Sequence, residues 1–149
     1  MVKAIILGAL YGLLAASLIM VALMGGMALL NPQTAIGRNP LPLIGLMLLW
    51  LMMAGAPGAF LLSILISVRL DFLARRNQPR PVILRTAVRY GSFLGFVNLV
   101  ITMVLLDPHP VGIETINPLK MGYFLAPALL GGVGLGLGAA DGILSRKQS

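Results

Sequence analysis

Few side chains in this chain of 149 residues could take part in chemistry. The sequence has no cysteine and one histidine, His109. Disulfides, thiolate metal sites, cysteine nucleophiles and metal centres with several histidines are therefore excluded. The four acidic residues form no closely spaced pair of carboxylates, and no nucleophile is accompanied by a base. The pattern does not predict an enzyme or a metal site.

Two of the polar side chains inside long apolar runs, Asn98 and Asp141, could have a functional role. Asn98 could contact a polar ligand or pore water, or form an interhelical hydrogen bond worth about 0.6–2 kcal/mol. We favour the hydrogen bond, because no second polar group lies equally deep. Asp141 could act in a proton relay, but about 30 Å of helix separates it from Met121. An ion pair with Arg146 or Lys147 at the membrane surface is the favoured interpretation of Asp141.

Two further features could concern a bound pigment or quinone. His109 lies in the sequence DPHP, where an external turn is favoured over a pigment ligand. Met20, Met24 and Met27 form one helical stripe, which could line a quinone or carotenoid groove. Flexible packing is the more common use of methionine. No cofactor is evident, and a bound lipid, quinone or carotenoid stays open.

Arginines are concentrated in RLDFLARRNQPRPVILRTAVRY, residues 69–90, which hold one acid, Asp71. The arginines are Arg69, Arg75, Arg76, Arg80, Arg85 and Arg89. A nucleic-acid-binding arm is disfavoured, because few aromatic residues accompany them. We expect them to anchor this segment to anionic lipid headgroups. A docking surface for an acidic partner subunit is the alternative.

Composition indicates a membrane environment. Hydrophobic residues make up 58% of the chain and charged residues 10%, against about 25% charged residues in soluble domains. Four apolar runs, at 4–30, 43–68, 86–106 and 121–144, reach the roughly 20 residues that span a bilayer. The first run is too long for the apolar core of a signal peptide and is expected to remain as an anchor. The sequence predicts one polytopic domain over 1–149, an all-α integral membrane protein with four transmembrane helices in two hairpins.

The basic residues define an orientation for these four spans. Nine of the eleven Lys and Arg residues fall on one side: Lys3, the six arginines above, Arg146 and Lys147. Arg38 and Lys120 fall on the other side. The positive-inside rule places the first side in the cytoplasm. We therefore expect both termini in the cytoplasm (N-in/C-in) and a bacterial-type plasma membrane.

Small residues recur at four-residue spacing, which lets helix backbones approach closely. The positions expected to pack helices are Gly8, Gly12, Gly91, Gly95, Asn98, Gly134, Gly138 and Gly142. Two glycine stripes on the last span predict a close neighbour on each side. Pro57 predicts a kink in the second span. Such a break can mark a transporter site, although plain packing is favoured.

These patterns favour a non-catalytic accessory or scaffold subunit of a larger membrane complex, such as a respiratory or photosynthetic assembly. Its partners would be other membrane subunits and anionic lipids, and we expect docking through the glycine faces of the first and last spans. A small oligomeric transporter or channel is the alternative. The repeats of YG at 11–12 and 90–91 and of NPL at 39–41 and 117–119 leave open a duplication of the two hairpins.

Overall fold

The computed structural model describes residues 1–30, 41–50, 53, 55–106 and 118–145, without the side chains at 43, 47, 50, 102–106 and 118–124. The described chain is helical and contains no strand. Its helices are α1 (Val2–Leu30), α3 (Leu41–Trp50), α4 (Ala56–Arg75), α5 (Arg80–Leu106) and α6 (Pro118–Leu144). The prediction of an all-α protein is confirmed for these residues.

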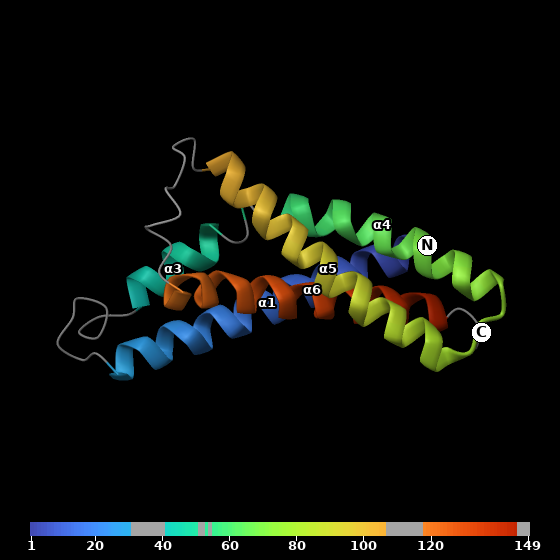
Figure 1. Cartoon of the computed structure of the whole chain (residues 1–149), viewed down its shortest axis with the longest axis horizontal. Helices are drawn as coiled ribbons and strands as arrows, with labels where there is room; N and C mark the ends of the chain where they lie inside the picture. Colours follow the sequence, from blue (N-terminus) through green and yellow to red (C-terminus); the bar gives the residue numbers. More distant parts are fainter. Residues whose placement is uncertain (31–40, 51–52, 54, 107–117, 146–149) are drawn as a thin grey trace.

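Helix α6 is the centre of the bundle (Figure 1). It packs along α1 and α5, and α4 closes the bundle by contacting α1, α5 and α6. Among the described elements, α3 has few neighbours and packs against α1. The two chain ends and the turn between α4 and α5 lie at the same end of the bundle. The arginine-rich segment is thereby brought next to both ends of the chain.

Small residues fill much of the interior, while large apolar side chains lie outside. Ala4, Ala87 and Ala139 are fully buried, whereas Leu18 and Phe93 are 69% and 59% exposed. In a water-soluble bundle, Leu and Phe would be among the residues most often buried. Close packing through small residues with large apolar residues outside is the arrangement that a lipid environment favours.

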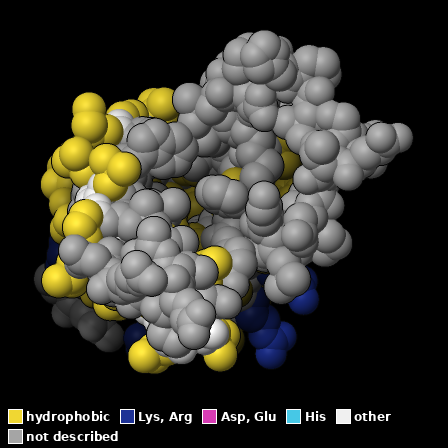
Figure 2. Space-filling view, turned by 90° about the vertical axis from the view of Figure 1, so that its left-hand side faces the viewer, with side chains coloured by type: hydrophobic (Ala, Val, Ile, Leu, Met, Phe, Trp, Pro, Cys, Tyr) yellow, Lys and Arg dark blue, Asp and Glu magenta, His cyan; other side chains and the backbone are white. Residues whose placement is uncertain are grey.

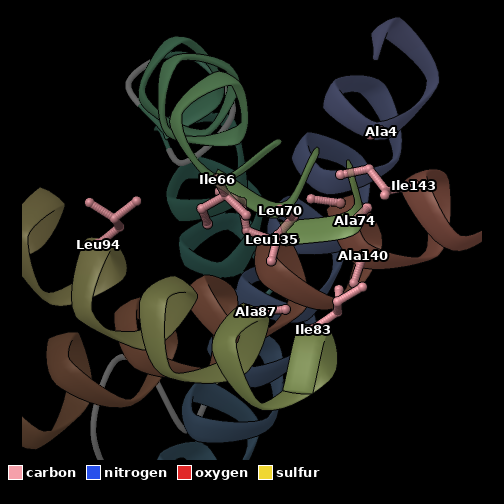
Figure 3. Packing of buried hydrophobic residues seen from close by; sticks show 11 residues of the cluster. Ala4, Ile66, Leu70, Ala74, Ile83, Ala87, Leu94, Leu135, Ala140 and Ile143 are labelled. Atoms are coloured by element: carbon pink, nitrogen blue, oxygen red, sulfur yellow. The ribbon is translucent and has the colours of Figure 1, made fainter. Parts of the chain in front are cut away.

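The larger buried side chains gather toward the end of the bundle that carries the termini. Ile66, Leu70 and Ile83 are fully buried there, and Figure 3 shows them converging from α4 and α5. Ile143 from α6 and Ala4 from α1 complete this cluster. This end has an apolar centre and charged exposed residues, unlike the stretches of the bundle where glycines face glycines.

Among the described residues, three helical segments are long and apolar enough to cross a membrane: Val2–Leu30, Ala56–Arg75 and Leu125–Leu144. The predicted four spans and their orientation are not confirmed by these segments. Helix α5 is not among these three segments; it carries Arg80, Arg85 and Arg89 in its first half, and the side chains of its last residues, 102–106, lie outside the described ones. Length and composition therefore support a membrane protein with three candidate spans.

The arginine-rich segment is more helical than the sequence suggested. Residues 69–85 were expected to connect two spans, but α4 continues to Arg75 and α5 begins at Arg80. Asn77 has a φ of 53°, the left-handed conformation that commonly ends a helix. The Asn77 amide donates to the Ala74 carbonyl at 3.1 Å, and the Gln78 amide donates to the Leu73 carbonyl at 3.2 Å. These two bonds form a Schellman motif, so the connection is a tight hairpin turn.

The second predicted span, 43–68, holds two described helices, and residues 51, 52 and 54 between them lie outside the described part of the chain. Helix α3 ends at Trp50 and α4 begins at Ala56, with Met53 and Gly55 in π-helical conformation between them. Pro57 lies at the start of α4, where its missing amide hydrogen costs no helical hydrogen bond. Pro57 thus lies in the first turn of α4, while the kink predicted from it falls on a stretch, 51–54, of which Met53 alone is described.

Candidate functional site

The closest helix contact in the described bundle joins α5 to α6 through glycine. A Cβ atom added to Gly91 would overlap the carbonyl group of Gly132, and one added to Gly95 would overlap the carbonyl of Ala128. A Cβ on Gly136 would meet the carbonyl of Ala87. Because backbone atoms block these positions, the contact has no room for a larger residue.

A second glycine surface of α6 packs on α1. A Cβ on Gly134 would lie 2.6 Å from the carbonyl oxygen of Tyr11, and one on Gly12 would lie 2.9 Å from Cβ of Leu135. Gly138 lies against the carbonyl of Leu7, and Gly142 lies against Ala4. The two glycine stripes of α6 thus face different helices of the same chain.

This arrangement corrects the expected docking surface. Gly8, Gly12, Gly134 and Gly138 were expected to leave grooves for a neighbouring subunit, but other helices of the same chain fill them: α4 and α6 at Gly8, α6 at Gly12, and α1 at Gly134 and Gly138. A bulky substitution at Gly12 should therefore damage the fold of the chain before it affects any partner. A docking surface must be sought on the outside of the bundle.

Asn98 lies against the first turn of α4. Its Oδ1 and Nδ2 atoms are 3.0 Å and 3.5 Å from the position of a Cβ on Gly58. Gly58 follows Pro57 in the first turn of α4. The side chain is half-buried and packs on the backbone of α4. The two features that the sequence singled out separately, Asn98 and Pro57, are brought together.

Sequence reasoning missed a hydroxyl group that joins α4 to α1. Ser63 is fully buried, and its hydroxyl donates to the Ile5 carbonyl at 2.6 Å. Gly8 makes room for it, because a Cβ there would overlap Ser63 Oγ. Ser67, one turn later, is also fully buried, and its Oγ has no hydrogen-bond partner in the described chain. The four-residue spacing of two serines in an uncharged run was the available signal.

The polar groups near the chain ends form surface contacts. Lys3 Nζ donates to Ser145 Oγ at 3.1 Å, and Ser145 Oγ donates to the Gly142 carbonyl at 3.3 Å. Asp141 is exposed; the ion pair expected for it involves Arg146 or Lys147, which lie outside the described residues. His109 lies outside them too. Of the methionine stripe, Met24 is buried, which agrees with a packing role.

The arginines at the α4–α5 hairpin differ in their partners. Arg75 Nε lies 2.7 Å from Asp71 Oδ2, and the Arg76 guanidinium lies 4.3 Å from the centre of the Phe72 ring. Both are exposed contacts, so each contributes about 1 kcal/mol or less. Arg69, Arg80, Arg85 and Arg89 are also exposed. Seen from the opposite end of the molecule, the described side chains are mostly hydrophobic, and Lys and Arg appear at the margin (Figure 2).

Within the described residues, His, Cys, Asp and Glu form no group of three that could hold a metal ion. Three described features bear on function: the glycine contacts between helices, the contact of Asn98 with Gly58, and the arginines of the α4–α5 hairpin. Comparisons with protein-family models, curated proteins and solved structures gave no match.

Proposed function

We propose that the protein is a non-catalytic integral membrane subunit of a larger membrane complex. It would cross a bacterial-type plasma membrane four times in two hairpins, with both termini in the cytoplasm. The observation that carries the proposal is the inverted packing: glycine and alanine lie inside, while side chains such as Leu18, Leu61 and Phe93 lie outside. Such a surface needs lipid or another membrane protein around it.

The buried polar groups support a structural role. Ser63 bonds a backbone carbonyl of α1, and Asn98 packs on Gly58. Both arrangements join helices to each other. Catalysis would require a group of reactive side chains within reach of a substrate, and the described polar contacts hold no such group.

A partner subunit would contact the outside of the bundle. Helix α3 is the best candidate, because it packs against α1 and is otherwise sparsely covered in the described chain. Leu46 and Leu49 of α3 are exposed. An apolar helix from a partner would cover this surface and gain close van der Waals packing with it.

Purification in mild detergent tests this proposal. The wild-type protein should retain other membrane proteins, identified by mass spectrometry of the co-purifying chains. Leu46→Trp should reduce their recovery, because a larger side chain on α3 separates the packed surfaces. Leu14→Trp, on the exposed face of α1, is the control and should leave recovery unchanged. Equal recovery from the wild type and both variants contradicts docking through α3.

A small oligomeric transporter or channel is the second candidate, favoured by the contact of the polar Asn98 side chain with Gly58, beside Pro57 in the first turn of α4. Helix breaks at such prolines line the binding sites of many carriers. Under this alternative, the purified protein alone would move a solute across liposome membranes, and Asn98→Leu would abolish that movement. Under the accessory-subunit proposal, the purified protein alone moves no solute.

The accessory-subunit proposal also makes a prediction for Asp141, whose side chain is exposed. Asp141→Asn should leave the activity of the parent assembly almost unchanged, because an exposed acid at the membrane surface is weakly coupled to its neighbours.

A further inference from the structure

We propose that the exposed stripe of α5 formed by Arg85, Arg89, Phe93, Phe96 and Val100 binds one anionic phospholipid, with its phosphate at the two arginines. All five side chains are exposed. At about 100° per residue they lie within an arc of about 80° on one side of the helix. The proposal rests on membrane insertion, which is part of the proposed function, but does not depend on a partner subunit.

The arginines of this stripe are free to bind an anion. In the described part of the chain, Asp71 pairs with Arg75, and the Phe72 ring is covered by Arg76. No hydrogen bond, ion pair or ring contact engages Arg85 or Arg89 among the described residues. They stand one helical turn apart, about 6 Å along the axis. Two guanidinium groups at this spacing can both donate hydrogen bonds to one phosphodiester group.

The apolar part of the stripe matches the rest of a phospholipid. Phe93, Phe96 and Val100 follow Arg89 toward the other end of α5, and the exposed fractions of the two phenylalanines are 59% and 45%. From Arg89 to Val100 the helix rises about 16 Å. This length is close to half of the roughly 30 Å hydrocarbon layer, which is the depth that one acyl chain occupies. The headgroup and the acyl chain therefore find matching surfaces on the same helix.

This combination distinguishes a lipid from other anions. An acidic protein segment would satisfy the two arginines but would leave the phenylalanines in contact with bulk lipid. A soluble phosphate would use the arginines alone. The occupant that uses both parts is a membrane phospholipid with net negative charge, such as phosphatidylglycerol.

Native mass spectrometry of the purified protein tests the site. After reconstitution with equal amounts of phosphatidylglycerol and phosphatidylcholine, the wild type should retain phosphatidylglycerol preferentially. Arg85→Gln/Arg89→Gln should weaken this retention by about twentyfold, because two attractive charges are removed. Arg75→Gln/Arg76→Gln removes the same charge from the same hairpin and should leave retention within about twofold of the wild type.

A second pair of variants tests the acyl-chain surface. Phe93→Ala/Phe96→Ala should also weaken retention, although the arginines remain. Excess inorganic phosphate should not displace the lipid. Equal losses in both arginine variants would contradict a defined site, and so would equal retention of the two lipids or displacement by phosphate. A further outcome would overturn the proposal. The Arg85→Gln/Arg89→Gln variant would lose a co-purifying acidic protein, yet it would retain as much phosphatidylglycerol as the wild type.

A separate experiment distinguishes failure of the proposed membrane insertion from failure of the lipid site. Flotation of liposomes after extraction at alkaline pH measures insertion independently of any bound lipid. The wild type and both arginine variants should float with the liposomes. A protein that stays in the soluble fraction would contradict membrane insertion itself, and with it the lipid site.

Discussion

Residue size at the helix contacts decides whether this bundle can form. At Gly95 an added methyl group would overlap the carbonyl of Ala128, whereas nothing lies within 4 Å of the same position on Gly26. Neither backbone can move without displacing the rest of its helix. The glycines of α5 and α6 therefore act as contact surfaces, while Gly26 does not.

Gly95→Ala and Gly26→Ala test this difference with the same chemical change. We expect Gly95→Ala to lower the free energy of unfolding by about 1–3 kcal/mol, because the α5–α6 contact is overpacked. Gly26→Ala should keep it or raise it by up to about 1 kcal/mol, because alanine favours a helix more than glycine does and nothing blocks the added methyl group. Helical circular dichroism during titration with SDS measures both values. Equal effects would show that the close approach of α5 and α6 is not required.

Two buried serines on α4 allow a similar comparison. Ser63 bonds the Ile5 carbonyl, while Ser67 Oγ has no partner among the described residues. Ser63→Ala should lower the free energy of unfolding by about 0.6–2 kcal/mol, the range for hydrogen bonds between membrane helices. Ser67→Ala should be neutral or stabilising, because it removes an unpaired buried hydroxyl. The same SDS titration would contradict this view if Ser67→Ala were the more damaging variant.

At the scale of elements, uncharged apolar runs were the most informative part of the sequence. Helix α1 begins two residues before the predicted span and ends with it at Leu30, and α6 ends at Leu144 as predicted. At the arginine-rich segment both helices extend beyond the predicted spans, α4 as far as Arg75 and α5 from Arg80. Hydropathy indicates which residues lipid can surround, and a helix can be longer than this apolar part. It therefore could not locate the ends of α4 and α5.

The sequence also could not predict which helices pack against each other. The glycine stripes of α6 predicted two close neighbours, and α1 and α5 lie there. Nothing in the spacing indicated whether those neighbours belonged to this chain or to another subunit, because the same small residues serve both kinds of contact. Ser63 was missed for a related reason: a serine in an apolar run gives no sign of its hydrogen-bond partner.

The turn between α4 and α5 depends on the left-handed conformation of Asn77. Asn77→Gly should keep or slightly raise stability, because glycine adopts a positive φ without steric cost. Asn77→Ala should lower the free energy of unfolding by about 1 kcal/mol, because alanine lacks the short polar side chain through which asparagine tolerates the left-handed conformation. SDS unfolding curves of the two variants measure the difference. Identical curves would indicate that the Schellman motif does not limit the stability of the hairpin.

At the scale of the whole molecule, charge divides the two ends of the bundle. Lys3 and the arginines of the α4–α5 hairpin lie at the end that carries the termini. In the orientation that we propose from the positive-inside rule, this end faces the cytoplasm. Since the chain has no cysteine, single cysteines report topology without background.

We predict that Gln78→Cys is protected from a membrane-impermeant maleimide in intact cells. Cysteines at Gln33 and His109, which lie outside the described residues, should be labelled. The expected difference follows from the positive-inside rule and an even number of spans. Disrupted cells, in which all three sites should react, provide the control. Labelling of position 78 alone in intact cells would reverse the proposed orientation.

The mass of the assembly extracted from its native membrane tests the central claim most directly. A chain of 15.7 kDa that works as an accessory subunit should be found in a detergent-solubilised complex whose mass includes other proteins. Native mass spectrometry with dissociation of the complex would then release this chain together with different subunits. If the protein is instead found as a monomer or homo-oligomer, with masses that are whole multiples of its own, and moves a solute in liposomes, the accessory-subunit account is contradicted.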